Sequence, residues 1–111
     1  MGQVPGRLSV DGVLEVVLTT SGRTAFLRLS GELDLATAPG LHRRLATLPD
    51  TVETVDVQAA ELTFLDLAGL DVLLDLATRL RTDGGALVVR APSPPVRRLL
   101  GLLADPLPVK G

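Results

Sequence analysis

The hydrophobic and polar positions along the chain alternate with two periods, and these periods predict strands and helices. Apolar residues recur at every second position, or form short apolar runs, in four segments, as is typical of β-strands. The predicted strands cover residues 14–19, 24–30, 54–58 and 86–90. In three other segments the apolar residues recur every three to four positions, which predicts amphipathic helices. The predicted helices cover residues 37–48, 67–81 and 94–104.

The order of these elements predicts how the sheet is built. A turn at 20–23 joins the first two strands into an antiparallel hairpin, whereas later strands are joined through helices. Right-handed crossovers then place the later strands in parallel. The clean alternation in 54–58 indicates that one sheet face is exposed to water. We therefore predict an α/β fold with a mixed, mostly parallel sheet of four to five strands and helices mainly on one face.

The two ends of the chain carry weaker signals. Residues 1–12 contain three glycines and a proline among polar neighbours, so we expect a flexible arm there. Residues 13–111 are then one domain, as expected for a chain of 111 residues. Two prolines at 106 and 108 allow only a short edge strand at the end.

Composition narrows the expected partners to proteins. With 11 Lys and Arg against 13 Asp and Glu, the net charge of -2 gives no general attraction to nucleic acid or anionic lipid. The two aromatic residues cannot build a stacking platform for single-stranded nucleic acid. The lack of cysteine agrees with a reducing compartment, and no apolar segment is long enough to insert into a membrane. We therefore expect a cytoplasmic protein whose oligomeric state is left open.

The turn before the second predicted helix is the most informative part of the chain. Asp66 stands where a carboxylate can accept from the free amides of the first helical turn, so a capping role and a direct functional role are both open. Leu67 falls beside the apolar stripe and should be partly exposed, either as an isolated surface residue or as the middle of a protein contact. Two small residues and an outward-facing carboxylate follow, namely Ala68, Gly69 and Asp71.

A second acidic residue, Asp34, follows the preceding sheet strand as Asp66 follows its own strand. Parallel topology would bring both loops to one rim of the sheet, where α/β proteins tend to place their sites. Two carboxylates could bind a cation there, but no matched histidine or third acid accompanies them. The single histidine, His42, lies on the polar side of its helix. We therefore predict no catalytic residue, no metal site and no cofactor.

Four short motifs appear in order along the chain. They are Gly31-Glu32-Leu33-Asp34, Phe64-Leu65-Asp66-Leu67-Ala68-Gly69-Leu70, Gly84-Gly85 and Ser93-Pro94-Pro95-Val96-Arg97-Arg98-Leu99. Together they resemble the STAS domain, and more narrowly the bacterial anti-sigma-factor antagonists, over about residues 13–104. The resemblance implies a STAS fold and a regulator of transcription that is not an enzyme. In that family the antagonist binds an anti-sigma factor with an ATPase-like fold, which then releases its sigma factor.

The resemblance also implies a phosphorylation switch, and this chain lacks its acceptor. In the family the partner often has serine-kinase activity and phosphorylates a Ser or Thr directly after the motif Asp. Asp66 matches the motif Asp, but Leu67 occupies the acceptor position, and Ala68 stands where the family often has Ser. A phosphate there would add about -1.5 to -2 charges beside Asp66 and Asp71, and leucine can carry none.

Three interpretations of the missing acceptor stay open. The protein is a permanently active antagonist, a diverged subunit that docks another partner through an apolar contact, or an accessory STAS subunit of a transporter or multi-protein signalling assembly. The leading hypothesis is an antagonist-like regulator that binds a kinase-type anti-sigma factor or a related switch protein. The predicted partner-binding residues are Asp34, Asp66, Leu67, Ala68, Gly69 and Asp71. An enzyme or small-nucleotide binder ranks lowest, because no nucleophile, base and orienting residue converge.

Overall fold

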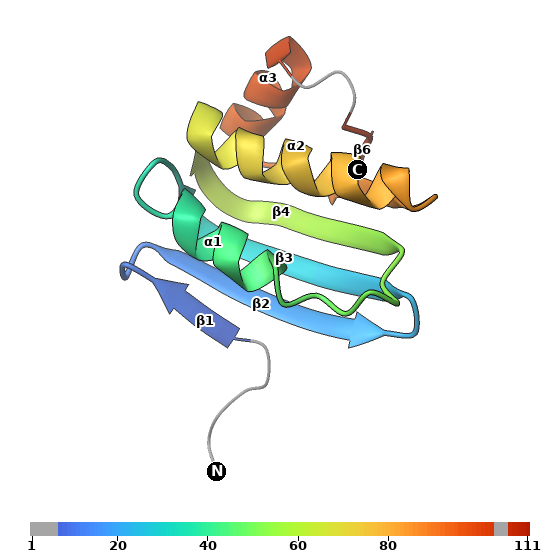
Figure 1. The fold of residues 1–111 in the computed structure, drawn as a ribbon. Helices are drawn as coiled ribbons and strands as arrows, with labels where there is room; N and C mark the ends of the chain where they lie inside the picture. The colour runs from blue at the N-terminus through green and yellow to red at the C-terminus, as the bar shows by residue number, and fades with distance from the viewer. Residues whose placement is uncertain (1–6, 104–106) are drawn as a thin grey trace.

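The computed structural model describes residues 7–103 and 107–111, and within them it contains one six-stranded sheet and three helices (Figure 1). The strands are β1 (Arg7–Val10), β2 (Leu14–Ser21), β3 (Thr24–Leu33), β4 (Thr54–Leu65), β5 (Ala86–Arg90) and β6 (Val109–Lys110). The helices are α1 (Ala38–Leu45), α2 (Leu67–Thr82) and α3 (Pro94–Leu103). None of the helices in these two ranges is long and apolar enough to cross a membrane.

The strands lie across the sheet in the order in which they occur along the chain. The β1–β2 and β2–β3 pairs are antiparallel, and the three pairs that follow are parallel. The prediction of a mixed, mostly parallel sheet is therefore confirmed. The sheet has six strands where four to five were expected: β6 is the short edge strand that the sequence allowed, and β1 is the additional strand.

β1 lies inside the segment that was expected to be a flexible arm. It pairs with β2 from Val10 opposite Leu14 onward, and the turn is made by Asp11 and Gly12, both with left-handed backbones (φ 51° and 72°). The prediction of an arm over 1–12 is thus wrong for Arg7–Val10, since four residues are too few to give a clear alternation of apolar and polar positions. Residues 1–6 lie outside the described part of the chain.

β3 and β4 both continue well beyond the ends that the alternation predicted. The pairing of these strands shifts register twice, and each shift adds one residue to β4 relative to β3. One shift lies at Gly31, whose φ of 101° is left-handed and where a Cβ would lie 2.0 Å from the carbonyl oxygen of Val13. The strand therefore continues past Gly31, and the extra residue of this bulge lies in β4 opposite it. The bulges interrupt the alternation of apolar and polar residues, so the predicted strands ended at Ser30 and Gln58.

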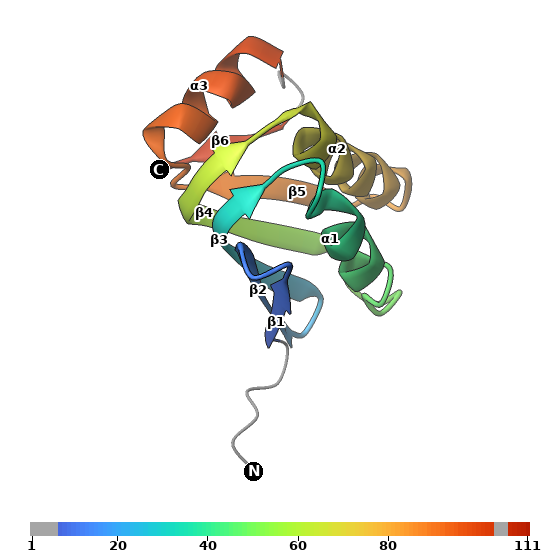
Figure 2. The same cartoon turned by 90° about the vertical axis from the view of Figure 1, so that its left-hand side faces the viewer.

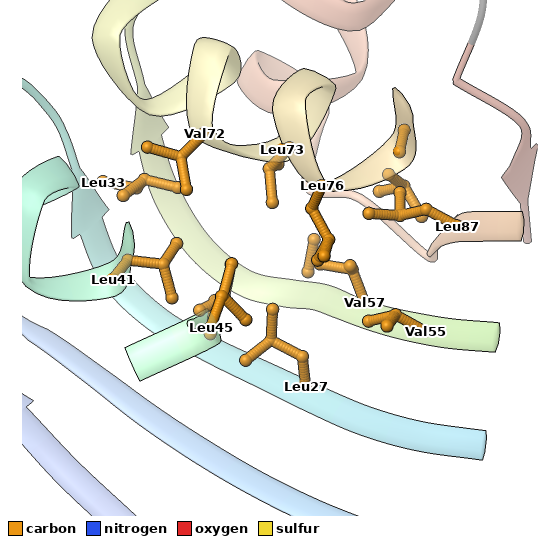
Figure 3. Close-up of a cluster of buried hydrophobic side chains, with 14 of the residues drawn as sticks. Leu27, Leu33, Leu41, Leu45, Val55, Val57, Val72, Leu73, Leu76 and Leu87 are labelled. Atoms are coloured by element: carbon orange, nitrogen blue, oxygen red, sulfur yellow. The ribbon is translucent and has the colours of Figure 1, made fainter. Parts of the chain in front are cut away.

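The hydrophobic core lies between the sheet and the helices α1 and α2, which lie side by side over one face (Figure 2). Leu41 and Leu45 of α1 and Leu73 of α2 point toward strand residues such as Leu27 and Val57 (Figure 3). On the opposite face of the sheet, Phe26 and Arg28 are exposed, as expected for a sheet covered on one side. All core side chains are aliphatic, and both phenylalanines are left at the surface.

α3 packs against the distal part of β4. Val96 and Leu100 are its buried residues. The Ser93 hydroxyl donates to the carbonyl oxygen of Leu62 at 2.5 Å, and the Ser93 N–H donates to Ala59 O at 3.3 Å. Ser93 therefore fastens the start of α3 to β4. α1 is shorter than predicted and ends at Leu45, although Leu48 beyond it is still buried.

Candidate functional site

The carboxyl ends of β3 and β4 lie next to each other, with Leu33 opposite Leu65 in the register. Asp34 and Asp66 are the next residues, so the prediction that both loops reach one rim of the sheet is confirmed. We call residues 34–37 the first rim turn and residues 66–69 the second rim turn. Both begin with the same three residues, Asp-Leu-Ala, and this repeat is the sequence signal that makes Leu35 the counterpart of Leu67.

Asp66 is the N-cap of α2, as predicted. Its backbone is extended (φ -114°, ψ -174°), and one carboxylate oxygen, Oδ1, accepts from the Gly69 N–H at 3.0 Å. The other oxygen, Oδ2, accepts from the Leu35 N–H at 3.1 Å, and the Asp66 N–H donates to Leu33 O at 3.2 Å. Asp66 therefore joins the two rim turns as well as starting the helix. Both carboxylate oxygens accept from backbone N–H groups. The main role of Asp66 is therefore to hold the two rim turns in place.

Asp34 has a local role within the first rim turn. Its Oδ1 accepts from the N–H groups of Ala36 at 3.0 Å and Thr37 at 3.1 Å. In return, the buried Thr37 hydroxyl accepts from the Asp34 N–H at 2.9 Å and donates to Glu32 O at 3.0 Å. These bonds close a tight turn before α1. Asp34 is thus held mainly by its own turn, and the two aspartates reach the same rim by different hydrogen bonds.

Two leucines project from the rim turns, and we call Leu35 and Leu67 the leucine pair. Leu67 is 60% exposed, in agreement with the expectation of partial exposure, and Leu35 is 75% exposed. The backbone of Leu35 is tied to Asp66, the residue before Leu67, so the two side chains rise from neighbouring, hydrogen-bonded segments. Leu35 was not predicted as a site residue, because a leucine in a predicted loop has no periodic pattern and only the Asp-Leu-Ala repeat marks it. The leucine pair therefore leaves two large aliphatic side chains exposed on the rim.

The small residues of the second rim turn have different roles. Ala68 is partly buried, whereas Gly69 is buried. A Cβ on Gly69 would lie 2.6 Å from Leu33 Cγ and 2.7 Å from Leu33 O. Gly69 was expected to contact a partner, but the side on which a side chain would stand faces Leu33 at the end of β3. The missing side chain at Gly69 lets α2 start close to the sheet.

Beside the leucine pair lies a shallow hollow between the N-terminal ends of α1 and α2. Its volume is about 400 Å³. The lining residues are Leu35, Ala38, Pro39, His42, Arg43, Ala68, Asp71 and Val72. Asp71 is exposed, as predicted, and stands on the α2 side, while His42 and Arg43 stand on the α1 side. The rim therefore combines an apolar centre with charged margins, which is the usual make-up of a protein contact surface.

Within the described ranges, no cluster of three or more histidine or acidic residues could hold a metal ion. His42 lies exposed on α1, and its imidazole makes no hydrogen bond among the described residues, so nothing orients it as a base. The arrangement of the rim favours the recognition of another molecule by shape and apolar contact.

Comparison with known protein families finds the same family that the sequence motifs resemble. The family model described as "Mlab, STAS domain" matches residues 16–104, which is most of the chain. The chain belongs to the STAS-domain family. Its sequence motifs, its strand order and its rim are thus those of a STAS domain in which the position after the motif Asp is Leu67.

Solved structures share the fold of this STAS domain. An anti-sigma factor antagonist from Mycobacterium paratuberculosis is 24% identical with a TM-score of 0.78, covering 93% of this chain and 90% of that one. The phosphorylated form of SpoIIAA, a Bacillus cell-fate determinant, is 23% identical with a TM-score of 0.71, covering 86% and 90%. The STAS domain of a SulP transporter from Vibrio cholerae is 14% identical with a TM-score of 0.53, covering 84% and 77%.

Proposed function

We propose that this STAS domain is an antagonist-like regulator that docks on an anti-sigma factor of the ATPase or serine-kinase type, or on a related switch protein. The contact is made by the leucine pair together with Ala68 and Asp71, and the aspartates Asp34 and Asp66 hold these residues in place. The protein acts by binding in the cytoplasm and catalyses no reaction. The similarity in fold to anti-sigma factor antagonists supports this choice of partner.

The observation that carries the proposal is the exposed aliphatic side chain of Leu67 on a rigid turn. Leu67 occupies the first position of α2, and Asp66 fixes that turn through hydrogen bonds to Gly69 and Leu35. A contact surface whose backbone is already ordered loses little conformational entropy on binding. Burial of a leucine side chain contributes about 2 kcal/mol to binding. Leu67 is therefore suited to sit at the centre of a contact.

Docking is measured by isothermal titration calorimetry with kinase-type anti-sigma factors from the same organism. Leu67→Asp places a charge at the centre of the contact and should weaken binding at least about tenfold. Thr78→Asp makes the same change in charge at an exposed position about three turns further along α2 and should leave the affinity within about twofold. Equal affinities for the wild type and Leu67→Asp would count against this surface.

We also propose that phosphorylation does not switch off docking at this position. The reason is chemical, because a leucine has no hydroxyl that could receive a phosphoryl group. Incubation with the kinase-type partner and ATP should leave residues 66–70 unmodified in the wild type, whereas Leu67→Ser should restore an acceptor beside Asp66. The site is located by mass spectrometry, with Leu67→Ala as the control without a hydroxyl. Phosphate within 66–70 of the wild type would contradict the loss of the switch.

A second candidate function is that of an accessory STAS subunit in a transporter or signalling assembly. The observation in its favour is the similarity in fold to the STAS domain of the Vibrio cholerae SulP transporter. The same leucine pair would then dock on another component of the assembly. Affinity capture from native cells separates the two candidates: recovery of permease and transport ATPase subunits would favour the second, and recovery of an anti-sigma factor would favour the first.

A further inference from the structure

The charges of the chain are divided unevenly between its last quarter and the rest. Residues 86–111 contain four basic residues and one acid, which gives them a net charge of +3. Because the whole chain has a net charge of -2, residues 1–85 carry the remaining -5. The positive part includes β5, α3 and β6, which lie at the side of the sheet far from β1 (Figure 1 and Figure 2). One side of the molecule is therefore basic, although the protein as a whole is acidic.

Three of these basic residues are neighbours, and we call Arg90, Arg97 and Lys110 the basic edge. Arg90 at the end of β5 is in register with Lys110 of β6, so the two side chains leave the same face of the sheet. The Arg97 guanidinium of α3 donates to the carbonyl oxygen of Gly111, the residue after Lys110. All three basic side chains are exposed, and the Lys110 ammonium group has no hydrogen bond or ion pair among the described residues. The basic edge is thus open to another molecule.

The guanidinium of Arg90 is held in place by a nearly buried carboxylate. Asp56 of β4 is 9% exposed, and its Oδ2 accepts from Arg90 Nε at 2.9 Å. Its Oδ1 is buried and has no hydrogen-bond partner among the described residues, so this aspartate lowers the stability of the fold. The terminal nitrogens of Arg90 make no hydrogen bond within the described ranges, and 49% of its side chain is exposed. Arg90 is therefore an ordered cation with free donors.

Other acids on this face of the sheet do not neutralise the basic edge. Asp56 is the acid that pairs with Arg90, and it leaves the edge with a net charge of +2. Glu61 lies 4.0 Å from the guanidinium of Arg28, two strands away from Arg90. Glu15 lies on β2, three strands from β5. The charge of the basic edge is therefore available to a ligand of opposite charge.

The size of this positive surface favours a short acidic segment over an extended polyanion. Arg28, Gln58, Arg90 and Lys110 form one row across four strands, which spans roughly 14 Å. A nucleic acid duplex or a membrane surface extends well beyond this row and would also face the -5 charge of residues 1–85. In an extended peptide, three acidic residues at alternate positions span about 13 Å. Such a segment can cover the row without contacting the acidic remainder of the protein.

We propose that the basic edge binds a short acidic segment of another protein. The free terminal nitrogens of Arg90 bind one carboxylate, and Lys110 and Arg97 attract its neighbours. The leucine pair lies beyond Leu65, seven residues further along β4 than the register partner of Arg90, which corresponds to roughly 20 Å. The two surfaces are therefore separate, and the domain can bind two protein segments at once.

The first test is a titration of the ¹⁵N-labelled protein at about 50 mM salt, where screening is weak. The probe is the peptide acetyl-Glu-Ser-Glu-Ser-Glu-amide, and its matched control has glutamine in place of each glutamate. The acidic peptide should shift the amide signals of Gln58, Arg90 and Arg97, and the glutamine peptide should not. No shifts there, or equal shifts with both peptides, would overturn the proposal. No anti-sigma factor is present, so this result is independent of the proposed function.

The second test measures how variants change the affinity for the acidic peptide. Lys110→Glu and Arg97→Glu should each weaken binding about three- to tenfold, because each loses an attraction and gains a repulsion. Arg43→Glu makes the same change in charge at an exposed position of α1, over the opposite face of the sheet, and should stay within about twofold. Arg90→Lys keeps the charge beside Asp56 but loses the guanidinium donors, so it should weaken binding about threefold. Equal affinities for the charge reversals and the Arg43→Glu control would overturn the basic edge.

Two larger anions test the choice of ligand. They are an oligothymidylate of about 12 nucleotides and vesicles that contain phosphatidylglycerol. Neither should shift the amide signals of Gln58, Arg90 and Arg97 at the same salt concentration. Shifts with either anion and none with the acidic peptide would assign the basic edge to a polyanion and overturn the acidic segment.

Discussion

The two rim turns start with the same three residues and both expose a leucine, yet they are built differently. In the first turn, one oxygen of Asp34 accepts from Ala36 and Thr37, within three residues of itself. In the second turn, the two oxygens of Asp66 accept from different segments, Gly69 in its own turn and Leu35 in the other. The first turn is therefore closed locally, and the second holds both turns together.

This difference shows how similar sequence motifs can carry different parts of one site. Asp66 and Gly69 determine how closely α2 approaches β3, so they set the position of both leucines. Asp34 and Thr37 only shape the connection into α1. Changes at Asp66 or Gly69 should thus affect stability and docking together, whereas a change at Asp34 should remain local.

The largest expected effect is that of Asp66→Asn. An asparagine has one acceptor oxygen, so either orientation of its amide places an NH₂ group against the N–H of Leu35 or Gly69. We expect a loss of about 3 kcal/mol in the free energy of unfolding, from one charge-assisted bond and one unpaired N–H. Urea unfolding followed by circular dichroism measures it.

Asp34→Asn is the matched control for this change. Only Oδ1 of Asp34 accepts hydrogen bonds among the described residues, so an asparagine can keep all of them. Its effect should be at most about 0.5 kcal/mol. Equal losses for the two variants would contradict the contrast between a local and a connecting aspartate.

Gly69→Ala should have the next largest effect. The added methyl group would lie 2.6 Å from Leu33 Cγ and 2.7 Å from Leu33 O, so α2 must move away from the end of β3. We expect a loss of about 2 kcal/mol, typical of overpacking, as measured by thermal unfolding. Gly101→Ala on α3 is the control, because a Cβ there meets nothing within 4 Å. It should be neutral or stabilising by up to about 1 kcal/mol, and a similar loss at both glycines would contradict the close approach.

The smallest effects on stability are expected for the leucine pair. Leu35→Ala and Leu67→Ala remove side chains that are 75% and 60% exposed, so each should change the free energy of unfolding by less than about 0.5 kcal/mol. Their effect should appear in binding, where each weakens the affinity for the partner about fivefold or more. Surface plasmon resonance with the kinase-type anti-sigma factor measures this. Loss of stability without loss of affinity would show that the leucines serve the fold and not the contact.

The parts of the fold that follow a regular period were predictable from the sequence. The strand at Ala86–Arg90 and the start of α2 at Leu67 agree with the prediction to the residue, because strong apolar patterns and the cap at Asp66 define them. The far ends of β3 and β4 were not predictable, since the bulges that carry them past Ser30 and Gln58 interrupt the period.

The candidate site was predictable where it depends on residues next to each other in the chain. The cap at Asp66, the exposure of Leu67 and the shared rim all follow from local patterns and parallel topology. The role of Leu35 and the inward-facing side of Gly69 depend on contacts between residues about 30 or more positions apart. Such contacts leave no signal in the spacing of residues along one chain.

The central claim is that the leucine pair meets the partner, and leucine methyl groups report on it directly. In a methyl-labelled sample titrated with the kinase-type anti-sigma factor, the signals of Leu35 and Leu67 should shift or broaden first, while those of the fully buried Leu27 should not change. A partner that binds with measurable affinity while the signals of Leu35 and Leu67 stay unchanged would contradict the account.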